Sequence, residues 1–250
     1  MSSSSKWVVR LAAREKPLLR LICVPYAGGN AQVFRPWGGK LPPWVELFAV
    51  DLPGRGGRFS EPPLLSLSPI VEQLGAALLP LLTQPYAVFG HSMGALIAFE
   101  TVRWLKQRRV REPKLLVVSG RSACSLPPRR QPLHGLSDDA FLAAVREFNG
   151  IPEEVLASAE LREMVLGVLR ADFTVGETYR FHPTPVLDCP LRVMVGDADP
   201  SVPRDSVEPW AELTRATTSI SVFRGDHFFL RSQEDEVIAL LQRDLEKLVL

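Results

Sequence analysis

The sequence predicts an α/β fold, with a mostly parallel sheet of about seven strands and helices on both of its faces. Two observations support this. Short apolar runs alternate along the chain with stretches of helical periodicity, which is the pattern of strand–helix–strand units. Most of these runs are continuously apolar, as expected for parallel strands that are covered on both faces.

Seven runs are interpreted as strands, and the first of them is expected to pair antiparallel with the second. They span residues 7–11, 19–24, 45–50, 86–89, 115–119, 191–195 and 220–223. Helical periodicity predicts helices over residues 68–82, 93–107, 206–214 and 234–248.

The interval between strands 115–119 and 191–195 departs from the alternation of strands and helices. It holds about 70 residues without an evident strand, whereas a single crossover needs only about a dozen. Apolar residues at helical spacing predict two helices in it, over 137–148 and 160–175.

The first of these helices has clear end signals, with Ser137 as its N-cap and Asn149-Gly150 as its stop. We interpret residues 126–188, approximately, as a helical insertion within one domain that spans 1–250. The insertion is either additional core or a lid over a site at the strand ends.

Composition excludes several classes. With 250 residues, 46% hydrophobic and 23% charged, the chain is neither disordered, nor collagen-like, nor a coiled coil. Its net charge of +1 gives no field that would draw it to nucleic acid or to a membrane. Residues 73–99 carry no charge, but Pro80, Pro85 and Gly90 interrupt them, which favours a helix, a turn and a strand over a membrane span.

The cysteines indicate neither a disulfide framework nor a metal site. Cys23, Cys124 and Cys189 are odd in number and far apart, and no Cys/His cluster has metal-ligand spacing. Residues 1–6 contain no apolar segment typical of a secretion signal. We therefore expect reduced thiols, a cytoplasmic protein, and no metal.

A G-x-S-x-G sequence, Gly90 to Gly94, lies between predicted strand 86–89 and predicted helix 93–107. This strand–turn–helix context is the one a nucleophile elbow requires, because its tight turn exposes the serine above the sheet. Ser92 is the candidate nucleophile. The alternative is an ordinary turn in which the serine only caps the helix.

A nucleophilic serine needs a base, and four histidines are available. His91 lies inside the elbow, and His134 and His182 lie in the insertion. His227 follows the last predicted strand. The chain order Ser…Asp…His of the α/β-hydrolases therefore favours His227 as the base.

The acid is expected after the strand that ends at Val195, where Gly196 to Pro200 offers Asp197 and Asp199. The Asp-Pro step favours Asp199, and Asp197 then stabilises the turn. Asp226, next to the histidine, is interpreted as a turn residue.

The oxyanion hole needs two backbone N–H groups. One is expected from Met93, the residue after the nucleophile. The second is expected from the loop after an early strand, residues 24–30, where Gly28-Gly29 permits a sharp bend.

With these residues the chain resembles the stand-alone type II thioesterases of polyketide and nonribosomal peptide synthesis, which are α/β-hydrolases. The resemblance covers nearly the whole chain and rests on segments 25–29 with Phe34, 51–55, 90–94, 169–173, 189–190, 196–200 and 225–230. One departure is Tyr26, where many members carry histidine; the backbone does that loop's work, so the catalytic reading is unaffected.

The resemblance implies that Asp199 is the acid, that the amides of Ala27 and Met93 form the oxyanion hole, and that the inserted helices are a lid. It implies hydrolysis of acyl groups from the phosphopantetheine arm of carrier proteins, as an editing activity on a synthase. No Asp-Ser-Leu attachment motif occurs, so the protein is expected to act in trans. No cofactor is implied, and we expect a monomer.

Three other functions stay open: a medium-chain fatty acyl carrier-protein hydrolase, a general carboxylesterase, and an inactive α/β-hydrolase that serves as a binding module. For carrier docking, Arg129 and Arg130 are the candidates, because they lead from the active edge of the sheet into the insertion. The basic run 103–111 is expected to be a solvated helix end.

Overall fold

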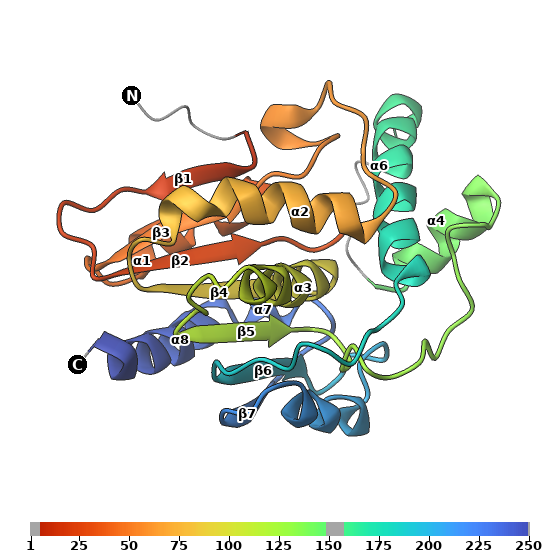
Figure 1. The fold of residues 1–250 in the computed structure, drawn as a ribbon. Helices are drawn as coiled ribbons and strands as arrows, with labels where there is room; N and C mark the ends of the chain where they lie inside the picture. Colours follow the sequence, from red (N-terminus) through yellow and green to blue (C-terminus); the bar gives the residue numbers. More distant parts are fainter. Residues whose placement is uncertain (1–5, 149–157, 250) are drawn as a thin grey trace.

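The computed structural model describes residues 6–148 and 158–249 (Figure 1). A seven-stranded sheet forms its centre, in the order β1-β3-β2-β4-β5-β6-β7. All adjacent strands are parallel except β1 and β3, which confirms the predicted fold class. The strands are β1 (Val8–Ala12), β2 (Leu19–Val24), β3 (Val45–Val50), β4 (Tyr86–His91), β5 (Leu115–Ser119), β6 (Leu191–Gly196) and β7 (Thr218–Phe223).

The pairing expected for the first strand is wrong. β1 pairs antiparallel with β3, with Val8 opposite Val50, and not with β2. β2 is bonded on one side to β3 and on the other to β4, so neither of its edges is left for β1. β1 precedes β2 in the sequence, but it therefore lies at the edge of the sheet, beside β3.

Helices cover both faces of the sheet, as Figure 1 shows. One face is packed by α2 (Leu67–Leu78) and α3 (Met93–Gln107), whose apolar residues form a cluster with the strands. The other face is packed by α1 (Trp37–Lys40), α7 (Phe229–Ser232) and α8 (Glu234–Val249). Two-sided burial explains why the central strands are continuously apolar.

Two predicted helices differ from the structure. The helix expected over 68–82 ends at Leu78 and continues as a 3₁₀ turn over Leu79–Leu81. The α-helix expected over 206–214 is absent, and two 3₁₀ segments, Arg204–Ser206 and Glu208–Leu213, take its place. The buried residues there, Val207, Trp210 and Leu213, recur every three positions, which suits the three residues per turn of a 3₁₀ helix.

Between β5 and β6 lie α4 (Asp138–Arg146) and α6 (Ala159–Thr178), the two helices expected in the insertion. Figure 1 shows both beyond the carboxyl ends of the strands. They share a small apolar cluster of Phe141, Val145 and Leu169, packed against Phe173. The predicted stop signal at 149–150 lies outside the described residues.

The basic run at the end of α3 is only partly solvated, which corrects the expectation for Arg103. This side chain is buried and donates to the Glu100 carboxylate and to the carbonyls of His182 and Pro185. It therefore anchors the end of the insertion to α3. Arg108 and Arg109 are exposed, as expected.

The three cysteines are buried and unpaired. Burial raises the pKa of the Cys124 thiol to about 11, so this thiol stays protonated at neutral pH. Across the two described segments, no helix combines the length and the apolar character needed to cross a membrane.

Candidate active site

Ser92 stands on a sharp turn between β4 and α3. Its backbone is left-handed, with φ of 56°, and its N–H donates to the Ser119 carbonyl at 2.8 Å. A Cβ on Gly90 would lie 2.2 Å from the Gly94 carbonyl oxygen, and one on Gly94 would lie 2.2 Å from that of Val24. The turn therefore requires both glycines, and it holds the serine in a conformation that side chains rarely adopt.

The structure brings Ser92, His227 and Asp199 together from loops that follow β4, β7 and β6. The Ser92 Oγ lies 2.9 Å from His227 Nε2, and His227 Nδ1 lies 2.7 Å from Asp199 Oδ2. Histidine and aspartate are both buried. This hydrogen-bonded relay can activate a serine for nucleophilic attack.

Ser201 is a member of this cluster that sequence reasoning missed. Its N–H and its Oγ both donate to Asp199 Oδ1, at 2.8 and 2.6 Å. Burial opposes ionisation of the carboxyl, but the hydrogen bond and charge of His227 and the two bonds from Ser201 outweigh it and lower the pKa of Asp199. The sequence did contain a signal for this contact: an aspartate side chain often accepts a hydrogen bond from the backbone two residues later, as Asp199 does from Ser201.

The other two aspartates have structural contacts in the same loops. Asp197 accepts a hydrogen bond from the Gly225 N–H at 2.9 Å and so joins the loop after β6 to the loop after β7. Asp226 accepts one from the Phe228 N–H at 2.8 Å, within its own turn. Of the candidates for the acid, Asp199 is the one whose carboxylate is hydrogen-bonded to the His227 imidazole.

Ala27, whose amide is the second one predicted for the oxyanion hole, lies in the loop after β2. Gly28 is left-handed, with φ of 75°, and the Gly29 N–H closes a turn onto the Tyr26 carbonyl at 2.9 Å. Within residues 6–148 and 158–249, the N–H groups of Ala27 and Met93 have no hydrogen-bond acceptor. Both residues line the same cavity as the serine, so these amides are available to a ligand oxygen.

A cavity of about 940 Å³ opens beside Ser92 and His227, between the sheet edge and the insertion. The Phe148 ring lies 5.7 Å from the His227 ring, centroid to centroid. This volume is at the upper end of small-molecule sites. Its apolar walls, which suit a hydrocarbon chain, include Met93, Leu126, Val145, Phe148, Leu169, Phe173, Phe181 and Phe228.

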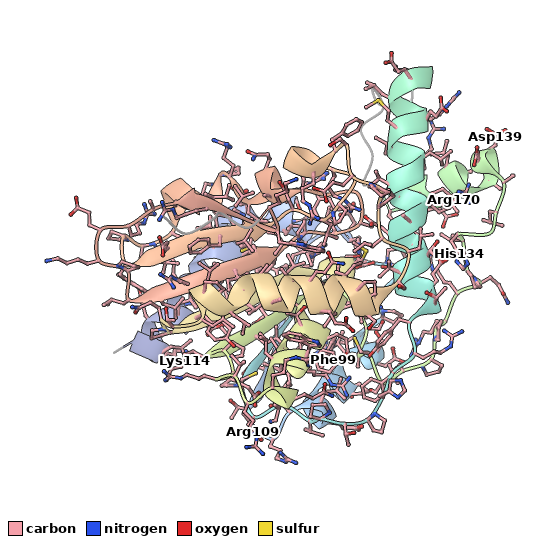
Figure 2. All side chains as sticks on the ribbon, turned by 45° about the horizontal axis from the view of Figure 1, so that its top comes forward. Phe99, Arg109, Lys114, His134, Asp139 and Arg170 are labelled. Atoms are coloured by element: carbon pink, nitrogen blue, oxygen red, sulfur yellow. The ribbon has the colours of Figure 1, made fainter. Side chains whose placement is uncertain are left out.

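The three remaining histidines are not members of this relay, although the His91 ring lies 5.2 Å from the His227 ring, centroid to centroid. His91 is fully buried, with Nδ1 2.9 Å from Ser119 Oγ, and burial holds its pKa well below the ordinary value, with the neighbouring His227 acting in the same direction. His134 contacts Glu177 of α6 at 2.6 Å, beside Arg170 (Figure 2). His182 is exposed, and its carbonyl accepts the bond from Arg103.

In the part of the chain that the structure describes, no three His, Cys, Asp or Glu side chains gather as a metal site would require. The groups that the structure does bring together at the sheet edge are the serine hydroxyl, the imidazole and the Asp199 carboxylate.

Comparison with known proteins gives one consistent family. Residues 19–245 match the model of the thioesterase domain. The chain is 40% identical over 245 residues to the gramicidin S biosynthesis protein GrsT of Aneurinibacillus migulanus, covering 98% of this chain and 96% of that protein. It is 40% identical over 240 residues to the thioesterase PikA5 of Streptomyces venezuelae, covering 94% and 83%.

Among solved structures, the fold matches the type II thioesterase BorB from the borrelidin biosynthetic cluster with a TM-score of 0.89. That match has 34% identity and covers 98% of this chain and 100% of BorB. The type II thioesterase YbtT from the yersiniabactin pathway matches with a TM-score of 0.88 and 31% identity, covering 98% and 100%.

Proposed function

Because the chain belongs to the thioesterase family, and is a hydrolase of acyl thioesters, we propose that its substrates are acyl groups on the phosphopantetheine arm of carrier proteins. In this role it acts in trans and clears stalled or aberrant units from a polyketide or nonribosomal peptide synthase. The observation that carries the proposal is the relay of Ser92, His227 and Asp199 at the mouth of a large apolar cavity.

In the proposed reaction, Ser92 Oγ attacks the thioester carbonyl carbon while His227 Nε2 takes its proton. Asp199 keeps the imidazole oriented and stabilises its charged form. The amides of Ala27 and Met93 donate to the oxyanion of the tetrahedral intermediate. The C–S bond then breaks, and the imidazolium gives its proton to the leaving sulfur.

The second half of the cycle releases the acid. A water molecule attacks the acyl ester on Ser92, and His227 takes the water proton. The ester C–O bond breaks, the proton returns to the serine oxygen, and the free carboxylic acid leaves. No metal or organic cofactor enters either half.

We assign the insertion, approximately residues 126–188, the role of a lid that holds the acyl chain. Several of its described apolar side chains, among them Val145, Leu169 and Phe173, line the cavity, and the Phe148 ring packs against the imidazole ring. The acyl chain extends from the serine between α4 and α6 in this arrangement.

Carrier docking is proposed at Arg129 and Arg130, which line the same cavity. Arg129 is paired with Asp205 at 2.9 Å, and Arg130 with Glu147 at 3.7 Å, and all four side chains are about half exposed or more. Exposed pairs of this kind contribute little stability, so the acidic surface of a carrier domain can replace these partners.

The proposal extends to a monomer in the cytoplasm, where the buried, unpaired thiols of Cys23, Cys124 and Cys189 would stay reduced. Size-exclusion chromatography with light scattering tests the oligomeric state.

The experiment that tests the function compares two substrates side by side: an acylated carrier protein and a p-nitrophenyl ester with the same acyl group. A carrier-directed thioesterase has the higher kcat/KM on the carrier. Preference for the small ester would favour a general carboxylesterase, and binding without turnover of either would favour the inactive module. A medium-chain fatty acyl carrier-protein hydrolase would show itself by a sharp preference for unbranched chains.

A further inference from the structure

Asp172, on α6, is a buried carboxylate that the reaction described above does not use. It is 2% exposed, and its partner Arg55, from the loop after β3, is 5% exposed. The guanidinium binds it in a bidentate manner: Nη2 donates to Oδ1 at 2.7 Å, and Nη1 donates to Oδ2. Two buried charges in this geometry link the insertion to the sheet edge.

The loop that carries Arg55 is itself held firmly. Nε and Nη2 of Arg55 donate to the Pro53 carbonyl, and Gly54 and Gly56 are both left-handed. Asp51, at the start of this loop, accepts the N–H of Ala31 at 2.7 Å. Arg55 is therefore presented to α6 by a fixed turn.

Asp172 has a third donor, and this one belongs to the oxyanion loop. The Gly28 N–H donates to Asp172 Oδ2 at 2.7 Å. Leu169, one turn earlier on α6, packs against the same residue, since a Cβ on Gly28 would lie 2.8 Å from its Cδ2. One face of α6 thus contacts the peptide unit directly after Ala27.

From these contacts we infer that Asp172 is a positioning residue for the oxyanion hole: it fixes the left-handed Gly28 and thereby aims the Ala27 N–H at the carbonyl oxygen. Its bond occupies the Gly28 N–H, which leaves Ala27 as the donor of this loop. Arg55 holds the carboxylate in the orientation that this bond needs. The inference rests on the proposed function, because it assigns Asp172 a part in the same reaction.

A buried Arg–Asp pair with a purely structural role would stabilise the fold but would not affect the oxyanion hole. The molecule contains such a pair, which serves as a control. Arg192 of β6 binds Asp244 of α8 in a bidentate manner, at 2.7 and 2.8 Å, and both are largely buried. This pair touches neither the cavity nor the loop after β2. Asp244→Asn therefore reports the general cost of breaking a buried Arg–Asp pair.

The test compares Asp172→Asn with Asp244→Asn, at a temperature where circular dichroism shows both fully folded. The substrate is an acyl-pantetheine thioester. The probe is an alkyl trifluoromethyl ketone, which adds Ser92 Oγ to its carbonyl carbon and places the resulting oxyanion in the hole. We expect Asp172→Asn to lower kcat on the order of 10- to 100-fold with little change in KM. The loss is smaller than for removal of an oxyanion-hole donor, because the Ala27 N–H remains but is less well oriented.

The affinity for the ketone is expected to fall in parallel with kcat in Asp172→Asn and to stay within about twofold of wild type in Asp244→Asn. Arg55→Lys keeps a positive charge and should lose less kcat than Arg55→Gln; this pair replaces Asp172→Asn if that variant does not fold. Unchanged ketone affinity in Asp172→Asn, or an equal fall in Asp244→Asn, would overturn the inference. A wild-type protein that hydrolyses no thioester would instead overturn the proposed function.

Discussion

The two sides of the cavity are built differently. On the sheet side, Ser92, His227 and Asp199 sit on short loops directly after parallel strands, joined by hydrogen bonds of 2.7 to 2.9 Å. On the insertion side, the described residues of α4 and α6 share a small apolar cluster, supplemented by ion pairs such as that of half-buried Arg170 with exposed Asp138. The sheet side can therefore hold reacting atoms in place, while the insertion side shapes the space around them.

Because the two sides differ in this way, mutations on the sheet side and mutations in the insertion are expected to change activity differently. Changes on the sheet side are expected to affect every thioester equally, because all substrates share the reacting carbonyl. Changes in the insertion are expected to affect substrates unequally, because carrier and acyl chain differ. Asp172 is the exception that crosses the boundary, since it lies on α6 but bonds to the oxyanion loop.

The largest effect is expected for Ser92→Ala. Removing the nucleophile should lower kcat by about 10⁶-fold on both carrier-bound and pantetheine thioesters, as in other serine hydrolases. Steady-state assays on both substrates measure it, and circular dichroism checks that the fold is intact. A variant that keeps most of its activity on either substrate would show that the sheet side does not supply the nucleophile.

The next largest effect is expected for Asp199→Asn. This change should lower kcat by about 10⁴-fold, because the amide favours the wrong imidazole tautomer. Asp197→Asn is the matched control, since Asp197 bonds to the Gly225 N–H and not to the imidazole, and it should lose far less. The reverse ranking would move the acid to Asp197.

On the insertion side, Arg129→Glu with Arg130→Glu should raise KM for an acylated carrier about tenfold at low salt, with kcat unchanged. Turnover of a small acyl-pantetheine thioester should be spared, and the effect should shrink as salt screens the charges. The control is Arg108→Glu with Arg109→Glu, the same charge change at two exposed residues that directly follow α3; Arg109 is labelled in Figure 2. Equal loss on both substrates, or an equal effect of the control pair, would exclude this docking site.

The smallest effect concerns stability on the sheet side. Because the pKa of buried His91 lies well below its ordinary value, the unfolded chain binds a proton near pH 6.5 that the folded chain does not. The free energy of unfolding should therefore fall as the pH drops below about 6.5, by up to about 1.4 kcal/mol per pH unit from this group.

Urea unfolding between pH 5 and 8 measures that slope in wild type and in His91→Asn, which can keep the bond to Ser119. The variant should show a shallower slope by about one proton, whatever its stability at pH 8. Identical slopes would mean that His91 is protonated in the folded protein.

The sheet and the elbow could be predicted from the sequence because local signals specify them: continuous apolar runs mark the strands, and the glycines at 90 and 94 mark the turn. The edge position of β1 could not, because it depends on which edges of β2 are already occupied. The 3₁₀ segment at 208–213 could not be told from an α-helix, because buried residues three positions apart also occur along one face of an α-helix.

Long-range polar contacts were the hardest to foresee. Arg103 lies in a run of basic residues, and nothing in that run distinguishes it from its exposed neighbours. Asp172 and Arg55 stand 117 positions apart, and only the fold brings them together. Both belong to segments on which the family resemblance rests, but the sequence offered no chemical role for either.

The most direct test of the central claim, that Ser92 carries the acyl group of a carrier-bound thioester, is rapid-quench intact-protein mass spectrometry. Wild type is mixed with an acylated carrier protein and sampled before and during turnover. We expect an acyl adduct that peptide mapping assigns to Ser92, with the carrier returning to its free-thiol form; Ser92→Ala should leave the carrier acylated. Deacylation of the carrier by Ser92→Ala at the wild-type rate, or an adduct on another residue, would contradict it.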